Sequence, residues 1–206
     1  MNKFRFLLLT KSYKDNGYCV AGLNLDENKF VRLMLENNPK SSIPYYYMAA
    51  YECLDILEIN PIRHIPFGCQ TENVLMRFSP SPQKIGHATL YQLFGYLSPS
   101  TKIFDNTDKR VLPSEITKLD QSLGLYFVEN LSIHCYINED HPSYKCTFKY
   151  YGNWYRNISL TDPAYREPHF DEVVLEKAII VVSLPALPFV DDCYYKFVAK
   201  IFKLGD

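Results

Sequence analysis

The segment Tyr144–Pro163, YKCTFKYYGNWYRNISLTDP, decides the fold of this chain. Apolar and polar residues alternate on both sides of Gly152-Asn153, a dipeptide typical of a tight turn. The pattern predicts two antiparallel strands, Tyr144–Tyr151 and Trp154–Leu160. Successive side chains of a strand point to opposite faces. The core face of the first strand is therefore expected to carry Tyr144, Cys146, Phe148 and Tyr150. On the second strand, Trp154, Arg156 and Ile158 are expected to share one face.

The outer face of this hairpin has two open interpretations. Six aromatic side chains and three cations lie between Tyr144 and Arg156. Rings that stack on bases and cations that contact phosphates make up a surface for single-stranded nucleic acid. An ordinary half-buried hairpin in a tyrosine-rich protein has the same composition. The candidate binding residues of this segment are Lys145, Lys149, Trp154 and Arg156.

Strand patterns occur in two groups along the chain. The first group is Phe4–Ser12, Tyr18–Asn24, Phe30–Met34, Glu52–Asn60 and, as a strand or a short helical turn, Thr71–Phe78. The second group is Gly124–Ile137 with a bend near Asn130, Tyr144–Tyr151, Trp154–Leu160, Val173–Leu184 and Tyr194–Leu204. Asp15-Asn16-Gly17 is a turn signal between the first two strands. Greek-key barrels of the OB type are built from five strands at this size.

One helix is expected between the two groups. Apolar residues recur at helical spacing in His87–Leu97, at Leu90, Leu93, Phe94 and Leu97. Two prolines in Ser79–Gln83 mark a candidate boundary. The sequence therefore predicts an all-β protein of two tandem OB-fold-like five-stranded barrels with one connecting helix. Residues 1–84 would form the first barrel, 85–122 a helix-containing linker packed between the barrels, and 123–206 the second barrel.

Composition restricts the classes of function. The 206 residues are 47% hydrophobic and carry a formal net charge of −1, so the chain folds and has no global basic field. A nucleic-acid site would have to be a local patch. The apolar run near the N-terminus is short and predicts a first strand rather than an export signal, and no stretch is long enough to span a membrane. Six scattered cysteines without a CxxC pair suit reduced, buried thiols in a cytoplasmic protein.

Other polar clusters are candidates for binding rather than for catalysis. The polar residues of the first strands, Lys11, Ser12, Tyr18 and Arg32, are expected to converge near one rim. Thr161 and Asp162 precede Pro163 in a pattern typical of a strand-ending turn. The five histidines show no metal-binding spacing, and no phosphate loop or nucleophile elbow is present. We therefore expect no catalytic residues, no metal and no cofactor.

The motifs together resemble those of the dual OB-containing domain family. The first is Thr10-Lys11-Ser12 followed by Gly17–Gly22 and then Phe30–Leu33; the second is Gln70–Asn73, QTEN. Trp154–Arg156 with Ser159–Pro163, and the ending LPALPFVDDCYYKFVAKIF, complete the resemblance. The chain departs from the family pattern at Ala186-Leu187, where a glycine is expected before Pro188, and at Phe30, where a tryptophan is expected. Mapped by motif, the family's polar positions are Lys11, Ser12, Tyr18, Arg32, Asn73, Trp154, Arg156, Thr161, Asp162, Tyr195 and Lys196.

The resemblance implies two OB barrels and a binding module of prokaryotic defence or conflict systems. Its ligand would be nucleic acid, expected to be single-stranded, or a nucleotide. An alternative of another class is an adaptor that docks an effector protein of the same defence system. A third is an enzyme acting on nucleic acid, for which the sequence contains no motif.

Overall fold

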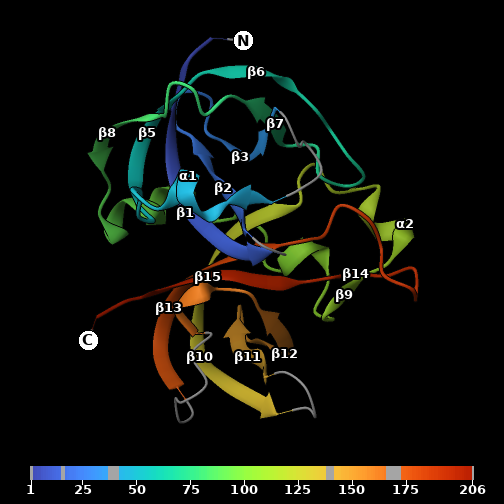
Figure 1. The fold of residues 1–206 in the computed structure, drawn as a ribbon. Helices are drawn as coiled ribbons and strands as arrows, with labels where there is room; N and C mark the ends of the chain where they lie inside the picture. Colours follow the sequence, from blue (N-terminus) through green and yellow to red (C-terminus); the bar gives the residue numbers. More distant parts are fainter. Residues whose placement is uncertain (1, 15–16, 37–41, 138–141, 166–172, 206) are drawn as a thin grey trace.

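Two β-barrels stacked on one another form the body of the protein (Figure 1). The computed structural model describes residues 2–14, 17–36, 42–137, 142–165 and 173–205. The Asp15-Asn16 part of the first predicted turn lies outside these residues. The predicted all-β fold with two OB-like barrels is confirmed.

The first barrel begins with a three-stranded meander: β1 (Phe4–Lys14), β2 (Gly17–Asn24) and β3 (Lys29–Leu35). β5 (Asp55–Ile59) pairs antiparallel with β1, and β7 (Asn73–Met76) pairs parallel with β3. A single residue separates β5 from β6 (Pro61–His64), which pairs with β7. β5 and β6 therefore act as one bent strand that closes the ring from β1 to β7. This strand order, with its parallel pair, is repeated in the second barrel.

Short elements extend the first sheet at its margins. β4 (Ile43–Pro44) pairs with β2 and leads into α1 (Tyr45–Met48). β8 (Gln83–His87) pairs with β5, so the first sheet extends to His87 and the expected boundary at residue 84 falls inside this strand.

The second barrel is closed in the order β10-β11-β12-β15-β13. Its strands are β10 (Leu123–Ile137), β11 (Pro142–Tyr150), β12 (Asn153–Leu160), β13 (Val173–Ser183) and β15 (Phe197–Lys203). β12 and β15 are parallel and the other pairs antiparallel. The expected bend of β10 is confirmed, because the register shifts between Glu129 and Ser132 and Asn130 has φ of 50°.

The hairpin of β11 and β12 departs from strict alternation in two places. Its turn is Tyr151-Gly152, both with positive φ, and Asn153 already pairs with Tyr150, so the expected Gly-Asn turn is shifted by one residue. Asn157 also has positive φ, at 55°, and the ladder shifts register beside it. This β-bulge turns Ile158 into the core, whereas Trp154 and Arg156 stay outside. The prediction that these three side chains share a face is wrong.

The segment between the barrels holds short elements rather than one α-helix. The expected helix over His87–Leu97 is a 3-10 helix, η1 (Leu90–Tyr96), preceded by β8. A second 3-10 turn, η2 (Ile103–Asp105), β9 (Arg110–Val111) and α2 (Pro113–Ile116) follow. β9 pairs with β14 (Tyr194–Tyr195), and a last 3-10 turn, η3 (Pro163–Tyr165), follows β12. The linker is therefore tied to the second barrel by backbone pairing.

The two barrels share a third hydrophobic core at their contact. In β1, Phe6 and Leu8 point into the first barrel, whereas Leu7 and Leu9 point toward the second. Ile179 and Val181 of β13 meet them in the same cluster. Each fully buried side chain of this kind contributes about 1.5–3 kcal/mol. The unbroken apolar runs in β1 and β13 are thus explained, because both faces of these strands are buried.

Hydrogen bonds fix the contact between the barrels. Thr10 Oγ1 donates to the Ala199 carbonyl at 2.9 Å, and the Tyr13 amide donates to the Thr161 carbonyl at 3.0 Å. The pairing of β1 with the end of β12 and with β15 therefore sets the spacing between the barrels, which positions the cavity described below.

All six cysteines are free thiols, as expected for reduced cysteines. Only Cys146 and Cys193 are buried, however, and Cys135 is exposed. The expectation that the cysteines lie in the core is therefore wrong for the other four. Among the described residues, no helix is long and apolar enough to cross a membrane.

Candidate functional site: a cleft between the barrels

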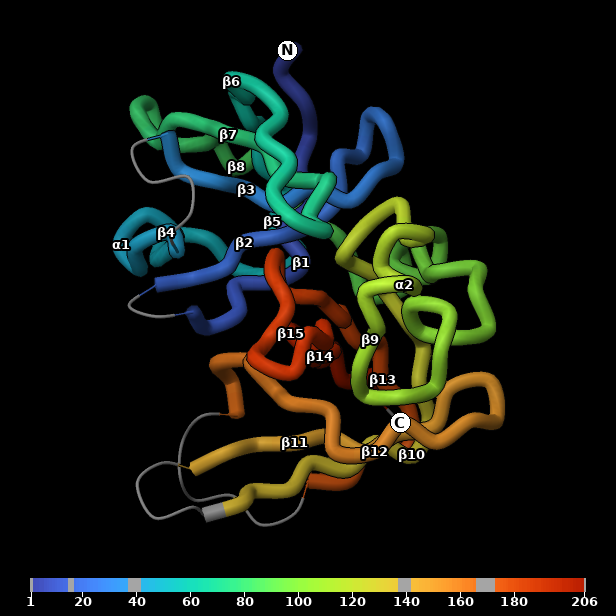
Figure 2. Tube along the Cα trace, turned by 90° about the vertical axis from the view of Figure 1, so that its right-hand side faces the viewer, coloured from blue at the N-terminus to red at the C-terminus, as the bar shows by residue number. Residues whose placement is uncertain are grey.

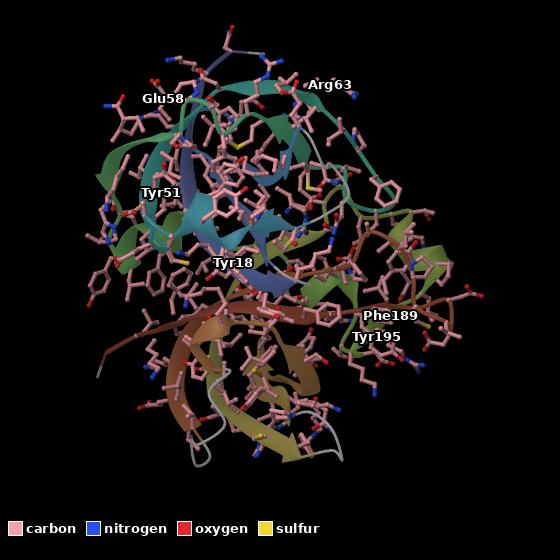
Figure 3. All side chains as sticks on the ribbon, viewed as in Figure 1. Tyr18, Tyr51, Glu58, Arg63, Phe189 and Tyr195 are labelled. Atoms are coloured by element: carbon pink, nitrogen blue, oxygen red, sulfur yellow. The ribbon has the colours of Figure 1, made fainter. Side chains whose placement is uncertain are left out.

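A cavity of about 300 Å³ lies where the two barrels meet, and we call it the inter-barrel cleft. The first barrel contributes strands β1, β2 and β3, and the second contributes β13, β15 and the loop after β13. Figure 3 shows Tyr18 at the lower side of the first barrel and Phe189 on the loop before β14, both near the level where the barrels meet. The residues that line it are Ser12, Tyr13, Lys14, Tyr18, Cys19, Arg32, Leu33, Met34, Gln70, Thr161, Ser183, Leu184, Pro185, Ala186, Phe189 and Phe197.

Arg32 forms the polar floor of the cleft. Its Nη2 lies 3.3 Å from a carboxylate oxygen of Glu72 and donates to Ser122 Oγ at 3.1 Å, while its Nη1 donates to Cys19 Sγ at 2.8 Å. Ser122 in turn donates to Glu72 through its hydroxyl and its amide. Burial disfavours the guanidinium charge, but the neighbouring Cys19 and Glu72 outweigh this effect and raise the pKa of Arg32. The floor therefore holds a buried ion pair that also joins the first barrel to the start of β10.

Tyrosine rings and lysines surround the mouth of the cleft. Tyr45 of α1 packs edge-on against Tyr18, with ring centroids 4.7 Å apart, and lies 6.1 Å from the ring of Tyr13. Lys14, at the end of β1, is exposed and lines the cleft. Lys11 lies over the Tyr18 ring at 5.7 Å, but its ammonium donates to two carbonyls of the α1 region. The mouth thus combines aromatic rings with the exposed Lys14.

The opposite wall is the loop between β13 and β14. Phe189 of this loop lies beside Phe197, the first residue of β15, with ring centroids 6.2 Å apart. The loop is tied to the first barrel by Cys69, whose amide donates to the Ala186 carbonyl at 3.1 Å. Gly68 is required at this contact, because its φ is +58° and a Cβ there would lie 1.7 Å from the Ala186 oxygen. A backbone contact between the barrels therefore sets the width of the cleft.

The structure brings together four of the sequence-predicted site residues: Ser12, Tyr18, Arg32 and Thr161 all line the cleft. Lys11 does not join them, since its ammonium is held by the carbonyls of Met48 and Tyr51. The expected convergence of the polar side chains of the first strands thus occurs for three of the four.

Asp162 and Asn73 are predicted binding residues that are buried outside the lining of the cleft. Asp162 accepts hydrogen bonds from the amides of Ile201 and Ala164 and pairs with Lys200 at 3.1 Å, so it forms the predicted strand-ending turn. Asn73 is 1% exposed beside Arg32 in the β3–β7 ladder. Its Oδ1 has no hydrogen-bond partner among the described residues.

The predicted residues of the β11–β12 hairpin lie on a different surface. Trp154 is 44% exposed, with the guanidinium of Arg156 5.3 Å from its ring, and Lys145 lies over the ring of Tyr136. Lys149 borders a second cavity, of about 360 Å³, with Phe94, Phe127 and Tyr151. In Figure 2 the turn of this hairpin is at the right of the lower barrel, whereas the facing ends of β1 and β2 are at the left. The hairpin face and the cleft are therefore separate candidate sites.

Tyr195 and Lys196 lie at the β9–β14 pair rather than in the cleft. Tyr195 donates to Asp191 at 2.7 Å, and its ring packs edge-on against Phe189 (Figure 3). Lys196 is 2% exposed and donates to the carbonyl and side-chain oxygens of Asn106 at 2.9 and 2.7 Å. Burial lowers the pKa of Lys196 to about 7. Lys196 therefore holds the linker against the second barrel, and its buried side chain is inaccessible to a large ligand.

Sequence reasoning missed most of the cleft walls. Three of the wall residues lie within the family motifs: Gln70 in QTEN, and Phe189 and Phe197 in the C-terminal motif. The alternation of apolar and polar residues does not mark any of them as a cavity residue. Tyr45 lies in a segment for which the sequence predicted no element. The predicted Lys11 and Ser12 are directly followed by Tyr13 and Lys14, which both line the cleft.

The described residues contain no group of three or more His, Cys, Asp or Glu side chains placed to hold a metal ion. Of the known proteins compared, no curated protein and no solved structure matches this chain. One family does match: the model described as "Dual OB-containing domain" covers residues 4–201, and the chain therefore belongs to the dual OB-containing domain family.

Proposed function

We propose that this protein is a non-catalytic module that binds a nucleobase-bearing ligand, either single-stranded nucleic acid or a nucleotide, in the inter-barrel cleft. The observation that carries this proposal is the convergence of Ser12, Tyr18, Arg32 and Thr161 on one cavity of about 300 Å³. Ligand pockets are concave and mostly apolar, with a few polar groups that fix orientation. The cleft has this composition, and aromatic rings flank its mouth.

The chemistry of the lining favours binding over turnover. The lining residues that the structure describes include no histidine and no carboxylate, the side chains that most often act as general bases. Exposed aromatic rings such as Phe189, at 48% exposure, offer faces for stacking. The near-zero net charge suits a short or single-site ligand better than a long track of phosphates.

Oligonucleotide binding by matched variants tests the proposal. Fluorescence anisotropy would compare single-stranded and double-stranded oligonucleotides and labelled nucleotides at two salt concentrations. Phe189→Ala in the cleft is paired with Trp154→Ala on the hairpin, because the two rings are exposed to similar extents, 48% and 44%. Loss of one stacking ring costs about 1–3 kcal/mol, or roughly 5- to 150-fold in affinity. We expect this loss for Phe189→Ala and wild-type affinity for Trp154→Ala.

Each outcome of that experiment has a distinct meaning. Loss of binding only in Trp154→Ala, or in Lys149→Ala/Arg156→Ala, would move the site to the hairpin face and reject the cleft. Absence of binding to every probe at low salt would reject the function itself. Turnover of a bound nucleotide would reject the non-catalytic part of the proposal.

A second candidate function is an adaptor that docks an effector protein. It is favoured by the loop after β13, where Leu187 and Val190 are 55% and 105% exposed. Co-purification of one stoichiometric partner that Val190→Asp abolishes, with oligonucleotide affinity unchanged, would support it. A role in a prokaryotic defence system stays a prediction of the family resemblance, and a cytoplasmic location stays a prediction of the cysteine pattern.

A further inference from the structure

We propose that the inter-barrel cleft takes the neutral base of its ligand and leaves the phosphate outside, at Lys14. This inference rests on the proposed function and specifies which part of the ligand the cavity recognises. It is carried by the charge balance of the floor, by one unpaired donor on Arg32, and by the apolar walls.

The floor of the cleft is electrically balanced. Arg32 is the cation there, and the carboxylate of Glu72 lies 3.3 Å from its Nη2, with both side chains only 4% exposed. Glu72 does not itself line the cleft, but its carboxylate offsets the charge of the guanidinium at this distance and repels a phosphate that enters, because charges interact strongly where water is scarce. Phosphate sites instead use free guanidinium forks or helix N-termini. A neutral group meets no such repulsion.

The buried Nε of Arg32 is a hydrogen-bond donor without a partner among the described residues. The two terminal nitrogens of Arg32 contact Cys19, Glu72 and Ser122. Leaving a buried donor unpaired is unfavourable. A ring nitrogen or carbonyl oxygen on the edge of a base supplies an acceptor of the kind that Nε lacks. Because Nε is itself buried, a shift of the Arg32 side chain toward the cleft brings it within reach of an acceptor edge of the ligand.

The walls fit the faces of a flat ring. Leu33 and Met34 of β3 stand on the side of the first barrel, and Leu184, Pro185 and Phe197 on the side of the second. About 300 Å³ is at the small end of ligand pockets, which span roughly 300–1,000 Å³. The cleft accordingly accommodates one base and its sugar, and further nucleotides of a strand continue across the mouth.

Lys14 is the cation that meets the phosphate. It is exposed at the end of β1 and lines the mouth, whereas the ammonium of Lys11 is already held by the carbonyls of Met48 and Tyr51. An exposed ion pair is worth about 0.2–1 kcal/mol. The phosphate therefore raises the affinity of a nucleoside by roughly 1.4- to 5-fold.

Calorimetric titration of the full-length protein separates base from phosphate. The probes are the common nucleosides, their 5′-monophosphates, ribose 5-phosphate and inorganic phosphate. We expect at least one nucleoside to bind and to displace its monophosphate, while ribose 5-phosphate and inorganic phosphate do not. Lys14→Ala should weaken binding of the monophosphate by about 1.4- to 5-fold and leave binding of the nucleoside unchanged. Lys149→Ala, a lysine on the hairpin face, is the matched control and should change neither.

The inference and the proposed function fail in different ways. Displacement of the nucleotide by ribose 5-phosphate or inorganic phosphate would overturn the base-in orientation and leave nucleotide binding intact. A nucleoside affinity that falls in Lys14→Ala would overturn the assignment of this lysine to the phosphate. Lack of binding by every nucleoside, nucleotide and oligonucleotide would reject both proposals.

Discussion

Replacing Glu72 by glutamine is expected to destabilise the protein strongly, because it leaves the buried charge of Arg32 without its partner. The carboxylate oxygen and the guanidinium nitrogen are 3.3 Å apart, and both side chains are 4% exposed. At an effective dielectric constant of about 20, two unit charges at this distance attract by about 5 kcal/mol. Breaking a buried pair from one side typically costs about 3–5 kcal/mol. We therefore expect the free energy of unfolding to fall by about 3–5 kcal/mol.

Urea unfolding at neutral pH, followed by tryptophan fluorescence and circular dichroism, measures this loss. The control is Arg32→Met/Glu72→Met, which removes both charges and should cost less than Glu72→Gln alone. Lys3, whose exposed pair with Glu58 carries little energy, offers a second comparison: Lys3→Met should change stability by under about 1 kcal/mol. A loss below about 1 kcal/mol in Glu72→Gln, or a double variant as unstable as the single one, would refute the reasoning.

Three further predictions concern the contacts that hold the barrels and the linker. Between pH 7 and pH 9, the stability of wild type should rise more steeply with pH than that of Lys196→Met. Burial lowers the folded-state pKa of Lys196 to about 7 from 10.5, so between these pH values the unfolded chain binds more protons than the folded protein. The stability of wild type therefore rises with pH, by up to about 1.4 kcal/mol per pH unit. Equal pH slopes of stability in the two proteins would contradict this. Gly68→Ala should lower the free energy of unfolding by more than about 2 kcal/mol and weaken ligand binding, because its Cβ would lie 1.7 Å from the Ala186 oxygen. A wild-type melting temperature in this variant would show that the loop after β13 moves away without cost. Thr10→Val should lower the free energy of unfolding by about 0.5–1.5 kcal/mol, because it removes the 2.9 Å hydrogen bond to the Ala199 carbonyl. An unchanged urea midpoint would mean that this hydrogen bond does not contribute to stability.

Periodicity predicted the barrels well because strand alternation is a local property. The buried face of β11, with Tyr144 and Phe148 in the core, follows directly from a period of two. The bend at Asn130 could also be predicted from the sequence, since asparagine tolerates positive φ. Alternation failed at Asn157, where the bulge reverses the faces of β12. A bulge is fixed by the neighbouring strand, and that pairing is not visible in one strand's sequence.

The candidate site was harder to predict from the sequence, because its walls come from distant parts of the chain. Arg32 was expected near a rim of the first strands, but it is 3% exposed and pairs with Glu72. Lys196 was expected at a ligand-binding position, yet it is 2% exposed and donates to Asn106 of the linker. Phe189 enters the cleft only because Gly68 lets the loop after β13 approach the first barrel. These placements depend on how the barrels pack, which residue spacing does not encode.

The most direct test of the account is photocrosslinking of a single-stranded oligonucleotide that carries one 5-iodouracil, followed by mass spectrometry of the joined peptides. If a base occupies the inter-barrel cleft, the crosslinks will map to the aromatic residues of its mouth and wall, Tyr13, Tyr18 and Phe189. They will be lost in the presence of excess free nucleoside. Crosslinks confined to Tyr151 and Trp154 of the β11–β12 hairpin, unaffected by nucleoside, would contradict the central claim.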